Sequence, residues 1–363
     1  MKKLLILLIV PFFLTGCFDY QELNNRAVIA GVAIDYQEDA FLVDLEILNN
    51  KKSSSQEEES DKTYYVSGTG STLDEAFQTA HSRLSKDPYY SHLKVLILGT
   101  ELAEEKLADV LDYMIRDATI RNIFLPVIAK GVSAKEILES TTKENPVVST
   151  SIQSMIENNK TNDNISTIRD FETFVNDIID PYRDGYINTV SKEEDTIYLS
   201  GVAAFHEKQL SFFLNVDDAI VFNTLNNDST NYYVNLACEN DKEEYLTIKL
   251  YQNEGTSFEF QENTITVKSK LNASIIEDGC GYDFRDADIY PSLEERFQPI
   301  IEEEFTQVIN DLKSHQTDIL GINSLYYKKY RTPLDSWYQQ NFLYDIEVTI
   351  NKNGLIFEVN QND

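Results

Sequence analysis

The sequence predicts a protein of mixed α/β and α+β fold, with three domains that each consist of a mainly β-sheet layer packed with helices. Three observations lead to this prediction. Apolar strand patterns alternate with amphipathic helical patterns over residues 63–190, which is typical of a sheet that is at least partly parallel. Strand-rich segments lie on both sides of that region. A long amphipathic helix is predicted over residues 293–312, close to the last strands.

Residues 1–16 have the pattern of a lipoprotein signal peptide and precede all the predicted domains. Two lysines stand before the apolar run 4–14, which is too short to span a bilayer as a helix. A Thr-Gly pair then precedes Cys17. In bacterial lipoproteins a cysteine at this place is diacylated on its sulfur, with acyl chains such as palmitate, and the chain is cut just before it. We therefore predict that Cys17 is the lipid attachment site, since two acyl chains anchor a protein stably. An ordinary signal peptide or a short uncleaved anchor is the alternative.

The composition limits the partners that the protein can have. The 363 residues include 31 basic and 61 acidic side chains, for a formal charge of -30. Such a surface repels nucleic acid and anionic lipid headgroups, and it favours cations or basic partner surfaces. Hydrophobic residues make up 42% of the chain, enough for sizeable cores. Beyond residue 16 no apolar run is long enough to span a membrane, so we expect a soluble body held at the membrane by its anchor.

The first predicted strands lie between the anchor and the α/β region. Residues 27–35 read as a buried strand and residues 41–48 as its hairpin partner, followed by a polar, Ser- and Glu-rich loop over 49–62. From residue 63 the predicted strands are 64–67, 93–98 and 124–129, and the predicted helices are 72–84, 102–116, 134–139, 149–158 and 168–179.

A third region, rich in strands, begins at residue 195. The predicted strands are 196–205, 210–214, 232–237, 245–251, 258–260, 264–276 and a final pair, 344–350 and 355–359, joined by a turn at 351–354. The segments 28–34 and 197–205 resemble each other, which predicts that both lie in one sheet with the α/β unit inserted between them. The predicted division is therefore a first domain of residues 17–62 and 191–255, a second of 63–190 and a C-terminal α+β domain of 256–363.

Residues that could carry chemistry fit structural roles better. The glycines of segment 67–71 lack a Gly-Lys-Ser/Thr ending, and Ser71 with Asp74 or Thr72 with Glu75 would cap a helix. The histidines have no zinc-ligand spacing, the acidic pairs of helix 293–312 suit a solvated face, and no Gly-x-Ser-x-Gly elbow is present. We expect no enzymatic activity, no catalytic residue, no metal and no cofactor. The histidines are His81, His92, His206 and His315.

Two further features stay open at this stage. Cys238 and Cys280 could form one disulfide in an exported protein or remain two buried thiols. The aromatic cluster of residues 326–330 with Trp337 could pack a C-terminal helix onto its sheet or form a platform for a carbohydrate or a protein interface.

Short motifs spread over most of the chain form a recognisable set. They lie in segments 16–19, 22–24, 31–35, 71–80, 92–99, 111–113, 116–117, 199–205 and 318–330. Together they resemble the Ger(x)C family, the lipoprotein C subunits of GerA-type spore germinant receptors. The usual tryptophan after the cysteine is Phe18 here, and the stretch after Arg331 is shorter than usual with a single Trp.

This resemblance implies a three-domain, non-enzymatic subunit on the outer face of the spore inner membrane. Its partners would be an A-type membrane-associated subunit and a transporter-like, membrane-embedded B-type subunit, in addition to the bilayer that holds the diacylglyceryl group on Cys17. The complex would respond to nutrients and trigger germination, and this subunit would serve assembly or signalling. A solute-binding lipoprotein of an importer is the alternative function, although no convergent set of polar groups for a bound solute is visible.

Overall fold

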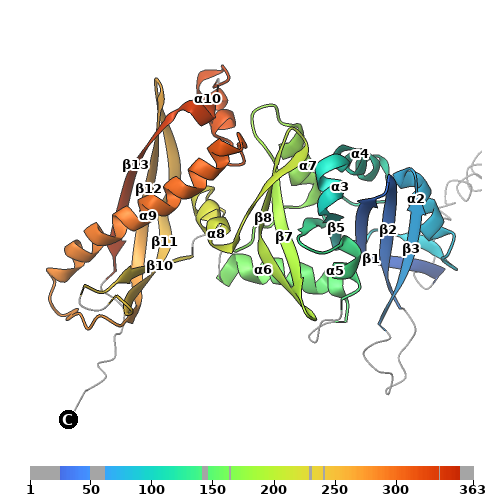
Figure 1. The fold of residues 1–363 in the computed structure, drawn as a ribbon, viewed down its shortest axis with the longest axis horizontal. Coiled ribbons are helices and arrows are strands. Elements are labelled where there is room, and N and C mark those ends of the chain that lie inside the picture. Colours follow the sequence, from blue (N-terminus) through green and yellow to red (C-terminus); the bar gives the residue numbers. More distant parts are fainter. Residues whose placement is uncertain are drawn as a thin grey trace, which may run out of the picture.

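The computed structural model describes residues 25–49, 62–140, 146–162, 165–228, 231–239, 242–334 and 336–351. These residues form two β-sheets, each covered by helices, with one helix between the two (Figure 1). The first sheet lies within residues 26–214 and the second within residues 232–350. The mixed α/β class that the sequence predicts is confirmed.

The first sheet has nine strands within the described residues, in the order β3-β2-β1-β5-β6-β7-β8-β9, with β4 beside β1. β1, β5, β6 and β7 run parallel, and antiparallel hairpins extend the sheet on both sides. β5 and β6 are apolar throughout and fully buried, as central parallel strands are. The strands are β1 (Arg26–Gln37), β2 (Ala40–Leu48), β3 (Thr63–Gly70), β4 (Asp87–Tyr89), β5 (Val95–Gly99), β6 (Leu125–Ala129), β7 (Tyr186–Glu193), β8 (Thr196–His206) and β9 (Gln209–Leu214).

Helices cover both faces of this sheet (Figure 1). α2 (Leu73–His81), α3 (Thr100–Glu105), α4 (Leu107–Arg116) and α7 (Phe171–Ile179) pack on one face, and α5 (Ala134–Leu138) and α6 (Val148–Asn162) pack on the other. The single helix predicted over 102–116 is wrong, because the chain breaks at Lys106 (φ -130°, ψ 12°). The break brings Leu102 of α3 and Val110 of α4 into the same core, where both are fully buried.

The second sheet has four described strands in the order β10-β11-β12-β13. The 26-residue helix α9 (Ile289–Ser314) covers one face and buries an apolar stripe there. The separate strands predicted at 245–251 and 258–260 are one strand. Its pairing with β12 continues on both sides of a register shift between Gln252 and Gly255. The predicted strand at 355–359 lies outside the described residues. The remaining elements are β10 (Tyr232–Ala237), β11 (Tyr245–Gln261), β12 (Thr264–Asp278), β13 (Asn341–Ile350), α10 (Ile322–Tyr330) and the 3₁₀ turn η4 (Trp337–Gln339).

The sheet topology bears on the predicted domain division. Segments 28–34 and 197–205 lie in one sheet, as predicted, within β1 and β8. The strands of the predicted second domain, 63–190, belong to that same sheet. The boundary predicted between residues 255 and 256 falls inside β11, next to a register shift between Gln252 and Gly255 in one continuous strand. The three-domain division itself stays a prediction.

α8 (Val216–Leu225) lies between the two sheets (Figure 1). Its residues Phe222 and Leu225 are fully buried in a core that contains Tyr186 and Val202 of the first sheet as well as the inner face of the second. Burial is concentrated in the second half of the helix, from Val221 to Leu225, whereas Asp217 in its first turn is exposed. The two sheets are therefore joined through continuous packing at α8.

A disulfide closes one end of the second sheet. Cys238 follows β10 and Cys280 follows β12, and their Cα atoms are 5.3 Å apart across 42 residues of sequence. Of the two states that the sequence leaves open for these cysteines, the structure has the bonded one.

Candidate functional sites

Cys17, the predicted lipid attachment site, lies outside the described residues, as do the other residues before Asn25. The first described strand, β1, begins at Arg26, nine positions further along the chain. In the described part of the chain, no helix combines the length and the apolar character needed to cross a bilayer.

The carboxyl edge of the parallel strands is where α/β proteins commonly bind anions, at helix N-termini. In this protein Asp35 at the end of β1 occupies that position for α5. Its carboxylate accepts hydrogen bonds from the backbone N–H groups of Ala134 (2.9 Å) and Lys135 (3.0 Å). Burial raises the pKa of Asp35, although both hydrogen bonds oppose this shift. The anion position of α5 is thus filled by a side chain of the protein itself.

Gly99 makes room for this carboxylate. A Cβ atom on Gly99 would stand 2.3 Å from Asp35 Oδ1, closer than any side chain can come. Gly31, on the same strand as Asp35, makes a second close approach: a Cβ there would lie 2.8 Å from Leu138 Cδ1 of α5. The motif residues Gly31, Asp35 and Gly99 therefore fit helix α5 against the sheet.

Glu46 of β2 does for α6 what Asp35 does for α5. Its carboxylate accepts from the backbone N–H groups of Val148 (2.8 Å) and Ser149 (3.1 Å). Glu46 is fully buried, and this burial raises its pKa. Nearby, Lys135 of α5 forms an ion pair with the buried Asp44 (2.9 Å). Both helices on this face are thus fixed at their N-terminal ends by carboxylates of strands β1 and β2.

The glycine segment 67–71 packs a helix and leaves no space for a phosphate. A Cβ on Gly68 would stand 2.1 Å from the carbonyl oxygen of Ala76, and one on Gly70 would stand 2.5 Å from its nitrogen. The predicted capping of α2 is confirmed, since Thr72 Oγ1 accepts from the N–H of Glu75 (3.2 Å). The Glu75 carboxylate accepts from the N–H of Ser71 (2.9 Å), one residue before the cap.

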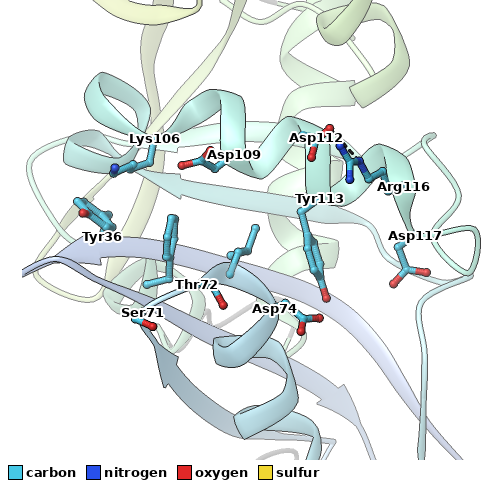
Figure 2. A pocket seen from close by; sticks show the side chains of 12 residues that line it. Tyr36, Ser71, Thr72, Asp74, Lys106, Asp109, Asp112, Tyr113, Arg116 and Asp117 are labelled. Atoms are coloured by element: carbon cyan, nitrogen blue, oxygen red, sulfur yellow. Dashed lines mark hydrogen bonds and ion pairs between the residues drawn. The ribbon is translucent and has the colours of Figure 1, made fainter.

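An open groove of about 660 Å³ lies between α2, α4 and the end of the β1–β2 hairpin (Figure 2). Lys106 stands at one end, 5.2 Å above the ring of Tyr36. Tyr113 points from α4 across the groove toward Asp74 of α2 (Figure 2), and burial together with the nearby carboxylates raises its pKa to about 12. The groove contains more carboxylates than cations, so it suits cationic groups better than anions. Its other charged residues are Asp109, Asp112, Arg116 and Asp117.

A second cavity, of about 680 Å³, lies where the two sheets meet. Asp184 Oδ2, near the start of β7, accepts from the N–H of Asp318 (2.7 Å) and lies 3.1 Å from His206 Nδ1. Asp318 in turn accepts from the N–H groups of Ile322 and Asn323 (both 2.8 Å) at the start of α10. Complete burial raises the pKa of Asp318 to about 7.

The aromatic cluster near residue 330 packs within the protein, as one of the two sequence alternatives has it. Tyr326 contacts the ring of Phe260 on β11 (5.2 Å between centroids), and Tyr327 stacks on Tyr182 beside the first sheet (4.1 Å). Trp337 is 5% exposed. This cluster therefore joins α10 both to its own sheet and to the junction.

The histidines are dispersed among these elements. His81 Nε2 lies 2.6 Å from the hydroxyl oxygen of Tyr90, and burial lowers the pKa of His81. The ring of His315 stacks on Phe212 (4.1 Å between centroids). Within the described residues, no group of three or more His, Cys, Asp or Glu side chains is arranged to hold a metal ion.

Sequence reasoning did not find the buried carboxylates at helix N-termini. Asp35, Glu46 and Asp318 stand in or beside apolar segments, and an acidic residue in a buried strand is the one signal that could have revealed them. The backbone N–H groups that they bind lie up to 103 residues away in sequence, so local spacing does not predict the pairs.

Comparisons with known proteins cover nearly the whole chain. Residues 19–192 match the family described as "Spore germination protein N-terminal domain", and residues 200–356 match "Spore germination B3/ GerAC like, C-terminal". The chain is 21% identical to "Spore germination protein KC" of Bacillus subtilis (strain 168), over 90% of this chain and 86% of that protein. It is 22% identical to "Spore germination protein GerQC" of Bacillus cereus, over 94% and 93%.

A solved structure has the same fold. The structure entitled "Crystal Structure of the GerBC protein" aligns with a TM-score of 0.51 and 17% identity, over 92% of this chain and 99% of that one. At this level of identity the likeness establishes the fold alone.

Proposed function

Because this chain belongs to the GerAC-like (Ger(x)C) family of spore germination proteins, we propose that it acts as a subunit of a nutrient germinant receptor. The observation that carries this proposal is the pair of family matches, 19–192 and 200–356, which together span both sheets. Relatives named as germination proteins align over about nine-tenths of the chain. The importer alternative is not favoured by these relatives.

The subunit is held at the spore inner membrane by lipid on Cys17, with its body on the outer face. The sequence pattern over residues 1–17 supports this attachment. Two acyl chains suffice for stable anchoring. The body then reaches its partners by lateral contact within the membrane plane.

The partners are the A-type and the transporter-like B-type receptor subunits, and the role of this chain is assembly or signalling without a reaction of its own. The buried polar groups described above support a structural role, because Asp35, Glu46 and Asp318 are all engaged with backbone N–H groups. The excess of acidic residues favours basic surfaces on these partners.

Deletion in a spore-forming host that lacks redundant receptors tests the proposal. Nutrient-triggered germination should be lost, and germination by a stimulus that bypasses the receptor should remain. A Cys17→Ala variant should leave the membrane fraction of the spore. Normal nutrient germination after deletion would contradict the receptor role, whereas unchanged membrane retention of Cys17→Ala would contradict the anchor alone.

A further inference from the structure

The parallel strands of the first sheet define one edge that lies close to the predicted anchor. β1, β5, β6 and β7 run in the same direction, so their first residues lie at a common edge, here called the amino edge. Arg26 opens β1 there, and Cys17 precedes it by nine residues. An extended chain of that length reaches at most about 32 Å. The amino edge is therefore the part of the body that the anchor holds nearest to the membrane.

Three exposed isoleucines lie at this edge. Ile115 is 48% exposed in the last turn of α4, and Ile123 is 67% exposed two residues before β6. Ile168 is 47% exposed and lies three residues before α7. The start of α7 is hydrogen-bonded to the residue that follows Ile123, because the N–H of Phe171 donates to the carbonyl of Phe124 (2.9 Å). We call Ile115, Ile123 and Ile168 the amino-edge patch.

The segment that carries Ile115 and Ile123 also contributes residues to the hydrophobic core, so the patch is not exposed because this segment lies away from the core. Between the patch residues, Ile120 is only 7% exposed and Phe124 only 1%. Single exposed apolar side chains are common in soluble proteins, but their collection at one place marks a contact surface. Here three β-branched aliphatic side chains stand at the one edge that the tether keeps near the bilayer.

The charges around the patch compensate each other. Arg116 pairs with Asp112 (3.0 Å), and Asp117 accepts from the N–H of Thr119 (2.8 Å). Segment 112–123 contains two acidic residues, Asp112 and Asp117, and two basic ones, Arg116 and Arg121, so it does not share the acidic excess of the whole chain, which disfavours contact with anionic headgroups. An uncharged, apolar contact suits the acyl region of a membrane.

We propose that the amino-edge patch rests on the bilayer and inserts its isoleucine side chains among the upper acyl chains. This inference depends on the lipid attachment at Cys17 proposed above, because the tether supplies the high effective concentration that lets a small apolar patch bind. The contact fixes the orientation of the body, with the amino edge on the membrane and the carboxyl edge, where β1 ends at Gln37, facing away.

The test uses the lipidated chain in phosphatidylcholine vesicles, with an environment-sensitive fluorophore on a single introduced cysteine. Ile123→Cys reports on the patch. Gln37→Cys is the matched control. Gln37 is an exposed residue at the end of the 12-residue strand β1, about 36 Å from Arg26 at the amino edge. Cys238 and Cys280 are bonded to each other and do not take the label.

We expect a blue-shifted emission and several-fold stronger quenching by spin-labelled lipid at residue 123 than at residue 37. Flotation of the same vesicles measures anchoring independently. A protein that floats but shows equal, water-like emission at both positions would overturn the orientation and leave the anchor intact. Failure to float would overturn the anchor and this inference together. A shift at residue 123 that requires added receptor subunits would overturn the inference in favour of a protein-covered patch.

Discussion

Asp35 Oδ1 lies 2.3 Å from the position that a Cβ atom on Gly99 would take. The end of β5 therefore has no space for any side chain while the Asp35 carboxylate binds the start of α5. One glycine and one aspartate, 64 positions apart in the chain, together fix the contact between the sheet and the helix.

A Gly99→Ala substitution should destabilise the protein by about 1–3 kcal/mol, the usual effect of overpacking a closed site. Backbone strain contributes nothing, because Gly99 has φ -67° and ψ 152°, which alanine adopts freely. The free energy of unfolding in urea gives the measurement. In an Asp35→Ala background, where the carboxylate is absent, the same substitution should have a clearly smaller effect; equal effects in both backgrounds would contradict the steric argument.

Glu304 gives a pH-dependent prediction. Burial and the charge of Asp217 raise its pKa to about 7, and Glu304 Oε2 has no hydrogen-bond partner in the described structure. The folded protein therefore binds more protons than the unfolded one between about pH 4.5 and 7, so this residue reduces stability as the pH rises through that window. Glu304→Gln removes the ionisation and should stabilise the protein at pH 8 by about 1–2 kcal/mol, allowing for solvent screening.

The variant should differ least from the parent protein at pH 4.5, where Glu304 is protonated in the folded state and about half protonated in the unfolded state. Urea unfolding at pH 4.5, 6 and 8 measures this trend. Asp318, whose pKa is also raised, is present in both proteins, so the difference between them isolates Glu304. A constant difference at all three pH values would show that ionisation is not its cause.

The Cys238–Cys280 disulfide should contribute about 4 kcal/mol to stability, from the chain entropy of a loop of this length. The bond spans 42 residues of sequence and connects the ends of β10 and β12. Replacing both cysteines with serine should lower the denaturation midpoint without changing the fold. Thiol titration of the denatured chain should find no reactive thiol from these residues before reduction and two after it; two thiols before reduction would contradict the bond.

The junction between the sheets depends on Asp184. An Asp184→Ala variant leaves the N–H of Asp318 without its acceptor, at a cost of about 1–3 kcal/mol. Amide hydrogen exchange should become faster at residues 317–321 and remain unchanged in β5. Glu295→Ala, an exposed change on α9, is the control and should leave exchange unaltered at both places. Unchanged exchange at 317–321 in Asp184→Ala would show that other contacts hold the junction.

Local pattern predicted most elements of this fold. Short continuous apolar runs placed β1, β5 and β6, and helical periodicity placed the core-facing side of α9 within the longer helix Ile289–Ser314. Periodicity did not reveal the break at Lys106, since the apolar residues of α3 and α4 fit one continuous stripe. It also predicted two strands, 245–251 and 258–260, where β11 is one strand with a register shift near Gly255.

The sites depended on information that local pattern does not contain. Asp35 belongs to a recognisable motif, but its partner helix α5 begins 99 residues later. The disulfide was one of two alternatives, because spacing alone gives no Cα distance. The junction of Asp184 with Asp318 joins residues 134 positions apart. In each case the role of a residue depends on its contact with a segment distant in sequence, and local pattern within one segment does not indicate that contact.

The packing of α8 against both sheets has a mechanical consequence. Phe222 and Leu225 lie in one core with Tyr186 of the first sheet and with the inner face of the second, so we expect the two sheets to move together. A small tilt of the first sheet would therefore become a larger displacement at the far end of the second, in proportion to its distance from the pivot. With the lipid attachment proposed at Cys17, such a body would transmit a tilt at the membrane as a lever arm does.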